Sequence, residues 1–274
     1  LEKFNIKESE PNLDKWKNFL HKLKNPTHQI NIGLVGKYVE LDDSYKSILE
    51  SLIHAGAENE VKVVVNSIHS EYLDKENISK NLSQLEGIIV APGFGQRGLD
   101  GKILAVEYAR VNKIPFLGIC LGMQMAVIEY ARNVKKIRYA NSTEISEKCK
   151  DPVIDLMTSQ KEIINKGGTM RLGAWDCEIE KNTKSYKCYK KKLISERHRH
   201  RYEFNNNYTD RIFDDKFVIA GSNPDTKLVE IVENIDHPWF VGVQFHPEYK
   251  SSVYNPHPIF VNFVKASLKK YLNK

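Results

Sequence analysis

A cysteine between two close glycines is the residue of this sequence best suited to covalent chemistry. In GICLG, Gly118 and Gly122 stand two residues before and two residues after Cys120. The segment before the cysteine predicts a buried strand and the segment after it predicts a helix, so Cys120 is expected at a tight turn. Serine hydrolases expose their nucleophile with the same spacing, because only glycine leaves space beside the turn. The helix N-terminus would favour the thiolate, and the Leu121 N–H would face an oxyanion.

The competing interpretation is that Cys120 is a small buried residue, the commonest role of a free cysteine. The turn alone does not decide between the two roles. A nucleophilic cysteine needs a base, and the base needs an acceptor that orients it.

A candidate base and its acceptor lie near the end of the chain. In VGVQFHPEY an apolar strand leads to His246, and Pro247 ends the strand so that Glu248 follows two residues later. A carboxylate at this spacing can accept a hydrogen bond from the imidazole and stabilise the imidazolium. His246 by itself is one of nine histidines and has a structural alternative. Combined with the turn at Cys120, the pair favours catalysis.

The turn APGFG, residues 91–95, is a third candidate element. It follows the apolar segment IIV, and such a turn can direct backbone N–H groups at a developing negative charge. Gly93 is the expected donor, because Pro92 has no N–H. Taken alone, the turn has a simpler interpretation, since most such turns only reverse the chain.

Composition limits the classes of protein to which the chain can belong. Its 274 residues, 41% of them hydrophobic, can bury a full core, and no segment resembles a membrane span or a secretory signal. The four cysteines form no CxxC pair, so reduced thiols are expected. Much of the formal charge of +6 lies in residues 184–192 and in the C-terminal segment, which predicts solvated surfaces. We expect a soluble cytoplasmic protein without a nucleic-acid or membrane partner.

Strands and helices alternate four times before residue 132. This pattern predicts an α/β fold with an open, largely parallel sheet covered by helices on both faces, and chemistry at the carboxyl ends of its strands. Gly56 is expected to end the first of the sheet's helices. Beyond residue 132, short alternating strands, among them 196–204, predict a small added antiparallel layer. The predicted strands before residue 132 are 29–38, 61–68, 85–90 and 114–119, and the clearest helices are 45–56, 100–112 and 121–131.

The segment RHRHR, residues 197–201, has several interpretations. In a strand, its arginines would face one way and its histidines the other. A charged surface edge or an RNA contact would fit this pattern, although few aromatic residues accompany it. Two histidines at this spacing also suit zinc, but they lack further ligands at the required spacing, so no metal site is expected.

The motifs APGFG, GICLGMQ and FHPE, in this order, resemble those of the class I glutamine amidotransferases, whose fold is flavodoxin-like. The resemblance covers most of residues 30–268. The segments GKYVELDDSYKS, FGQRG, NSTE, GGTMRLG, ERHRHRYE and HPWFVGVQFHPE are, in addition, similar to those of the C-terminal glutaminase domains of the CTP synthase family. The resemblance implies hydrolysis of glutamine to glutamate and ammonia.

The resemblance also implies roles for individual residues. Cys120 becomes the nucleophile, His246 the general base and acid, and Glu248 the group that orients it. Gly93 and Leu121 become oxyanion donors, although family members often have PGGFG where this chain has APGFG, and we expect Gly93 to suffice. The implied glutamine contacts are Gly93, Gln124, Glu144 and Arg201, and the implied contacts of a lid connected with GTP activation are Arg97, Phe94 and Lys37.

At the level of the whole protein, residues 1–28 are expected to be a connecting helix from an N-terminal synthase domain, and residues 29–274 the amidotransferase domain. By resemblance, the parent enzyme is a homotetramer that uses UTP, ATP and Mg in its synthase domain, with GTP as an allosteric activator. No cofactor is expected in this domain. Two alternatives remain: a free-standing γ-glutamyl hydrolase or an amidotransferase that serves another synthase, and a non-catalytic interaction or regulatory module with the same fold.

Overall fold

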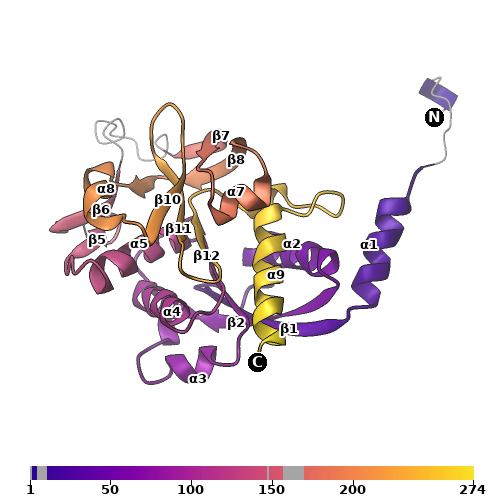
Figure 1. Cartoon of the computed structure of the whole chain (residues 1–274), viewed down its shortest axis with the longest axis horizontal. Helices are drawn as coiled ribbons and strands as arrows, with labels where there is room; N and C mark the ends of the chain where they lie inside the picture. The colour runs from indigo at the N-terminus through magenta and orange to yellow at the C-terminus, as the bar shows by residue number, and fades with distance from the viewer. Residues whose placement is uncertain (1, 5–10, 147, 157–169) are drawn as a thin grey trace.

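The structure is a computed structural model that describes residues 2–4, 11–146, 148–156 and 170–274. Nine strands within these ranges form one central sheet in the order β2-β1-β3-β4-β12-β11-β10-β7-β8 (Figure 1). Neighbouring strands are parallel from β2 to β12 and antiparallel from β12 to β8. The sheet strands are β1 (His28–Gly36), β2 (Val61–His69), β3 (Gly87–Val90), β4 (Phe116–Ile119), β7 (Arg171–Ile179), β8 (Leu193–His200), β10 (Phe217–Ser222), β11 (Val229–Asn234) and β12 (Phe240–Val243).

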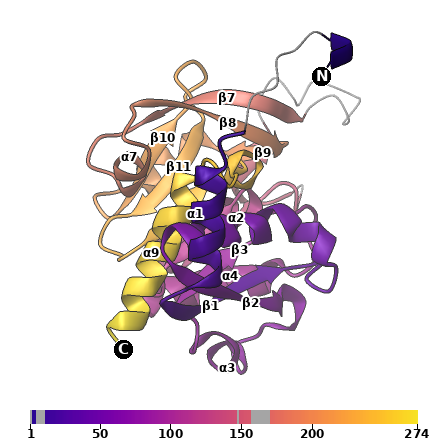
Figure 2. The same cartoon turned by 90° about the vertical axis from the view of Figure 1, so that its right-hand side faces the viewer.

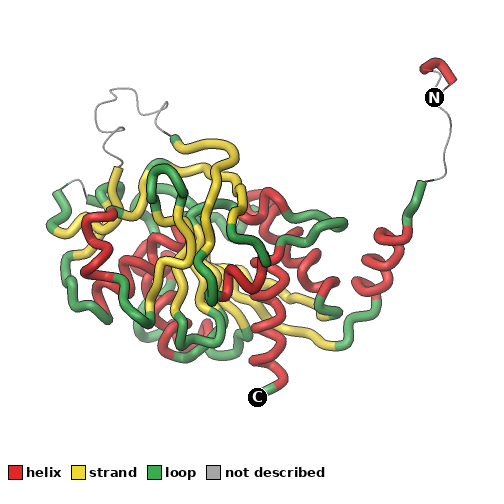
Figure 3. Tube along the Cα trace, turned by 45° about the horizontal axis from the view of Figure 1, so that its top comes forward, coloured by secondary structure: helices red, strands yellow, loops and turns green. Residues whose placement is uncertain are grey.

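Helices cover both faces of this sheet, and the strands lie between them (Figure 3). Helices α2 and α9 pack together on one face, while α4 and α5 pack together on the other. The α/β prediction is therefore confirmed, and most of the strands added after residue 132 extend the central sheet. The α-helices are α1 (Asp14–Lys24), α2 (Lys46–Glu58), α3 (Ile78–Leu82), α4 (Leu99–Val111), α5 (Leu121–Asn133), α7 (Lys184–Tyr189), α8 (Thr209–Ile212) and α9 (Pro258–Leu272), and the 3-10 helices are η1 (Glu2–Phe4), η2 (Asp42–Tyr45), η3 (Ser70–Tyr72), η5 (Asn206–Tyr208) and η6 (Pro247–Lys250).

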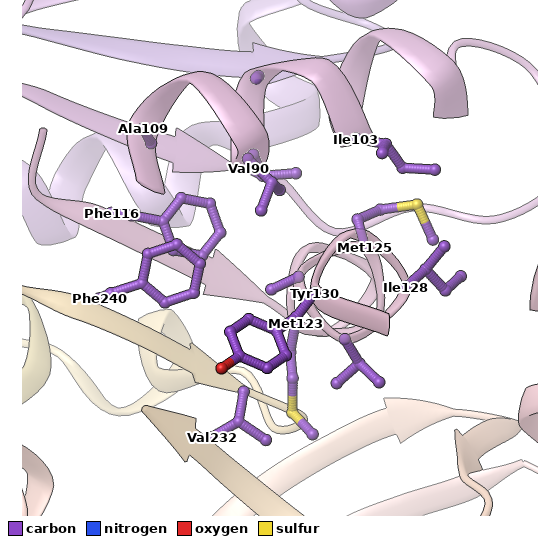
Figure 4. Packing of buried hydrophobic residues seen from close by; sticks show 14 of the residues in the cluster. Val90, Ile103, Ala109, Phe116, Met123, Met125, Ile128, Tyr130, Val232 and Phe240 are labelled. Atoms are coloured by element: carbon purple, nitrogen blue, oxygen red, sulfur yellow. The ribbon is translucent and has the colours of Figure 1, made fainter. Parts of the chain in front are cut away.

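The core on the α4–α5 face is closely packed around the strands that lead to the predicted site. Phe116 of β4 stacks on Phe240 of β12 with ring centroids 4.3 Å apart, and Met123 of α5 lies beside Val232 of β11 (Figure 4). All four side chains are buried. Aromatic stacking of this kind adds roughly 1 kcal/mol to the burial of apolar area. This packing fixes the position of β12 relative to its parallel neighbour β4.

Helix α2 does not end at Gly56, as the sequence predicted, but continues to Glu58. A β-carbon at Gly56 would lie 2.8 Å from the carbonyl oxygen of Val61, at the start of β2. Glycine is therefore needed there for the close approach of helix and strand and does not end the helix.

A second, smaller sheet in the described part of the chain contains β5 (Ala140–Ser142), β6 (Asp151–Leu156) and β9 (Tyr202–Phe204), in this order. The segment 196–204, predicted as one strand, divides at Arg201, because β8 pairs with β7 while β9 pairs with β6. Residues 167–169 of the GGTMRLG motif lie outside the described residues.

Helix α1 lies against α2 and contributes no buried residue (Figure 2). Phe19 of α1 contacts the ring of His54 of α2, with centroids 6.1 Å apart. None of the helices in the described ranges is long and apolar enough to cross a membrane.

Candidate active site

Cys120 lies directly between β4 and α5, and its backbone is strained. Its φ of 53° belongs to the left-handed region, which residues other than glycine seldom adopt. The turn is tight on both sides, since a β-carbon at Gly118 would lie 2.7 Å from the Gly122 carbonyl and one at Gly122 would lie 2.1 Å from the Val90 oxygen. The predicted nucleophile turn is present, and both glycines are needed for the close packing.

His246 and Glu248 follow β12, the strand beside β4. The Nδ1 atom of His246 lies 2.7 Å from Oε1 of Glu248, and both side chains are buried. The backbone N–H of His246 donates to the carbonyl of Arg197 in β8, and its ring stacks on Tyr249 at 4.9 Å. Since Glu248 occupies Nδ1, Nε2 is the nitrogen that can serve Cys120.

The charges around His246 favour its protonated form. Burial acts to lower the pKa of His246, but the nearby Cys120 sulfur and the Glu248 carboxylate act more strongly and raise it to about 11. At neutral pH the imidazolium is therefore stable beside the sulfur. This arrangement suits a thiolate–imidazolium pair, which is the reactive form of a cysteine nucleophile.

Replacing Glu248 with glutamine should weaken this pair without emptying the site. We expect kcat/KM for glutamine to fall roughly 10³-fold, because the amide does not stabilise the imidazolium and can favour the wrong tautomer.

The raised pKa of His246 stabilises the fold fully below about pH 6.5, and this contribution is lost as the pH rises towards about 11. The melting temperature of the unchanged protein should thus fall more steeply between about pH 7 and about pH 10 than that of Glu248→Gln. Glu178→Gln, which removes a partly exposed carboxylate paired with Lys192, is the matched control. If the melting temperatures of the unchanged protein and of Glu248→Gln fell equally steeply with pH, the role given to Glu248 would be contradicted.

A cavity of about 310 Å³ opens over Cys120. Its lining includes Gly93, Cys120, His246 and Glu248, which come from the ends of three adjacent strands, β3, β4 and β12. The Leu121 N–H belongs to the first turn of α5, where helical N–H groups lack partners within the helix. The cavity therefore brings together the predicted nucleophile, the predicted base and the turn expected to hold an oxyanion.

The three other side chains implied as glutamine contacts do not line this cavity. Gln124 is buried, and its Nε2 donates to the carbonyl of Tyr202 at 2.9 Å. Glu144 accepts a hydrogen bond from the Gly95 N–H at 2.7 Å. Arg201 lies at the division between β8 and β9. Their roles in binding remain predictions.

Several polar residues at or near the cavity were not identified from the sequence, among them Arg199 and Gln244. Arg199 lines it and lies 6.0 Å from the ring centre of Phe94. Gln244 is fully buried, and its Nε2 lies 3.7 Å from the Cys120 sulfur. The signal for Gln244 was a polar residue in an apolar segment, two positions before His246, and the signal for Arg199 was the alternation of RHRHR.

The prediction for the two faces of this segment is confirmed. Arg197 and Arg199 are exposed, whereas His198 and His200 are buried and lie 2.8 Å apart through their ring nitrogens. Burial, with help from neighbouring positive charge, lowers the pKa of His198 to about 2 and that of His200 to about 3. The neutral histidines lie against the buried ion pairs of Arg171 with Glu230 and Glu203, at 2.6 Å and 3.4 Å.

Of the three residues implied for the lid, Phe94 lines the cavity, whereas Arg97 and Lys37 do not. Phe94 is half-exposed, and Arg97 forms an ion pair with Glu71 at 2.7 Å. Lys37 is buried, and its Nζ donates to the carbonyls of Phe94 and Gly95, both at 2.6 Å. Lys37 thus holds the backbone that carries Phe94.

Comparison with known proteins gives consistent results. The family model of class I glutamine amidotransferases matches residues 40–266. The CTP synthases of Christiangramia forsetii and Flavobacterium johnsoniae are 61% and 60% identical, over 95% and 96% of this chain and 48% and 49% of their own lengths. A solved glutaminase domain of Trypanosoma brucei CTPS with bound acivicin superposes with a TM-score of 0.82 at 38% identity, covering 88% of this chain and 94% of that domain.

Coverage differs between the two kinds of relative. The chain spans about half the length of the curated relatives it matches, but nearly all of the solved glutaminase domain. The similarity therefore concerns one part of the longer proteins.

Proposed function

Since the chain belongs to the class I glutamine amidotransferases, we propose that it is the glutaminase domain of a CTP synthase and hydrolyses glutamine to glutamate and ammonia. The observation that carries the proposal is the joint geometry of the site. A strained cysteine between β4 and α5 shares a cavity with a histidine whose other nitrogen lies 2.7 Å from a buried carboxylate.

In the first half of the proposed reaction, the Cys120 thiolate attacks the side-chain amide carbon of glutamine. The carbonyl oxygen becomes an oxyanion, which the N–H groups of Gly93 and Leu121 stabilise. Each such donor typically contributes about 3 kcal/mol to the transition state. His246 then gives its Nε2 proton to the leaving nitrogen, so that ammonia departs and a γ-glutamyl thioester forms.

In the second half, neutral His246 removes a proton from water, which attacks the thioester. The carbon–sulfur bond breaks, glutamate leaves, and the thiolate–imidazolium pair returns. Glu248 holds the imidazole in one tautomer throughout and stabilises its charged form. We assign Gln124, Glu144 and Arg201 to glutamine binding, for which an arginine suits the substrate carboxylate and a carboxylate suits its ammonium group.

For the whole protein, we propose that the ammonia passes to an N-terminal synthase domain, which aminates UTP to CTP with ATP and Mg in the cytoplasm. Residues 1–28 would connect the two domains, in keeping with the lack of buried residues in α1. We further propose a homotetramer and activation by GTP through a lid that includes Arg97, Phe94 and Lys37.

The test uses 6-diazo-5-oxo-norleucine, a reactive analogue of glutamine. Mass spectrometry should find one adduct, on Cys120, and an excess of glutamine should slow its formation. Adding UTP, ATP and GTP to the full-length protein with glutamine should yield CTP. Labelling elsewhere would overturn the assignment of Cys120, and glutamine hydrolysis without CTP would indicate a glutaminase that serves another synthase.

A further inference from the structure

Lys102 is a completely buried lysine beside the candidate active site. It lies in the first turn of α4, and its Nζ donates to the carbonyl of Ala91 at 2.6 Å and, more weakly, to that of Pro92 at 3.5 Å. Among the residues that the structure describes, no acidic side chain forms an ion pair with it. A buried ammonium group without a carboxylate is costly, because charge loses its hydration on burial.

The two carbonyls that Lys102 binds belong to the turn expected to hold the oxyanion. In a trans peptide the carbonyl and the following N–H point in opposite directions. The Pro92 carbonyl and the Gly93 N–H belong to the same peptide. Because the Lys102 ammonium attracts this carbonyl on the buried side, the Gly93 N–H points away from Lys102. Lys37 acts similarly two residues later, since it binds the Phe94 carbonyl and the Gly95 N–H points away to Glu144.

The titratable groups that face Lys102 are Lys37 and Cys120. Burial, assisted by the charge of Lys37 and opposed by that of Cys120, lowers the pKa of Lys102 to about 7. A thiolate at Cys120 and an ammonium at Lys102 therefore stabilise each other. A β-carbon at Gly93 would lie 3.8 Å from Nζ of Lys102, which places the cation next to the oxyanion turn.

We propose that Lys102 is a positioning residue, which directs the Gly93 N–H into the cavity and stabilises the Cys120 thiolate with its positive charge. The inference rests on the proposed glutaminase reaction and adds a residue to it. Lys102 does not line the cavity, so it acts through the turn and through its charge.

The test replaces Lys102 with methionine, which keeps the length of the side chain and removes both the donors and the charge. We expect kcat for glutamine hydrolysis to fall about 100-fold, with KM changed less than about threefold, because the lost alignment matters most in the transition state. Alkylation of Cys120 by iodoacetamide should move to higher pH by about one unit. Lys102→Gln, which keeps a donor without the charge, should regain part of kcat but not the alkylation profile.

Lys184→Met is the matched control. The Nζ of Lys184 also donates to two backbone carbonyls, those of Asn234 and Ile235, at 2.9 Å and 3.0 Å, but these lie at the end of β11 and not in the turn at residues 91–95. Its replacement should lower stability and leave kcat and the alkylation profile unchanged. A folded Lys102→Met protein with the kcat and the alkylation profile of the unchanged protein would show that Lys102 only fills space.

A measurement on the unchanged chain does not depend on the folding of any variant. In protein with ¹⁵N-labelled lysine, the pKa of Lys102 should fall when iodoacetamide blocks Cys120 and removes its negative charge. An unchanged pKa would overturn the proposal. The alkylation and NMR measurements do not require glutamine hydrolysis. If the chain bound no glutamine, the proposed function would be disproved, but these two measurements would still test the role of Lys102.

Discussion

Cys120→Ala should abolish glutamine hydrolysis, with a fall in kcat of roughly 10⁵-fold or more. Alanine keeps the small size that the turn between β4 and α5 requires, and it removes the atom that forms the thioester. The oxyanion donors and the base remain, but without a nucleophile they contribute only weak residual catalysis. Glutamate release measured with a coupled dehydrogenase is the direct assay.

Two controls make this result specific. Cys188→Ala removes a thiol whose pKa burial raises to about 12, and it should leave hydrolysis unchanged. In the full-length protein, CTP formation from added ammonia should survive Cys120→Ala, because the synthase reaction then needs no glutaminase. Substantial glutamine hydrolysis by the alanine variant would disprove covalent catalysis at Cys120.

His246→Asn should lower kcat/KM for glutamine by roughly 10⁴-fold. Asparagine keeps a polar group near Glu248 but can neither hold the imidazolium proton nor pass it to ammonia. Cys120 also loses the positive charge beside it, so alkylation by iodoacetamide at neutral pH should become much slower. The pH dependence of alkylation, measured on both proteins, tests the base and the charge together.

His237→Asn is the matched control for this variant. His237 is also buried, its Nε2 lies 3.1 Å from the Ala109 carbonyl, and burial lowers its pKa to about 4. Its replacement should reduce stability without changing the alkylation profile of Cys120. If both variants slowed alkylation equally, the effect of His246→Asn would come from damage to the fold.

Much of the site was predictable because its parts follow strands with clear patterns. Alternation of strand and helix places the ends of β3, β4 and β12 at one edge of the sheet, so Gly93, Cys120 and His246 are brought together although the first and the last are 153 positions apart in the sequence. The spacing of the glycines around Cys120 also has one clear steric reason, which the close approach of Gly122 to Val90 bears out.

Other features depend on contacts that no local pattern contains. Gly56 resembles the end of a helix, yet it serves the close approach of α2 to β2. The segment 196–204 has one uniform alternation, but its two ends pair with strands of different sheets. The local sequence around Lys102, in the polar first turn of α4, is typical of an exposed residue. In the structure the turn at residues 91–95 covers Lys102 and buries it.

The position of the site within the central sheet affects how the protein loses activity. Because β3, β4 and β12 are interior strands, each bonded on both sides, their amide hydrogens should exchange only when the whole domain opens. Fraying of the edge strand β2 would leave Cys120 and His246 in register, whereas opening of the other edge strand, β8, would remove the hydrogen bond from the His246 N–H to Arg197. The protein should therefore tolerate local opening at the β2 edge, and on heating its activity should be lost in the same cooperative transition as the fold.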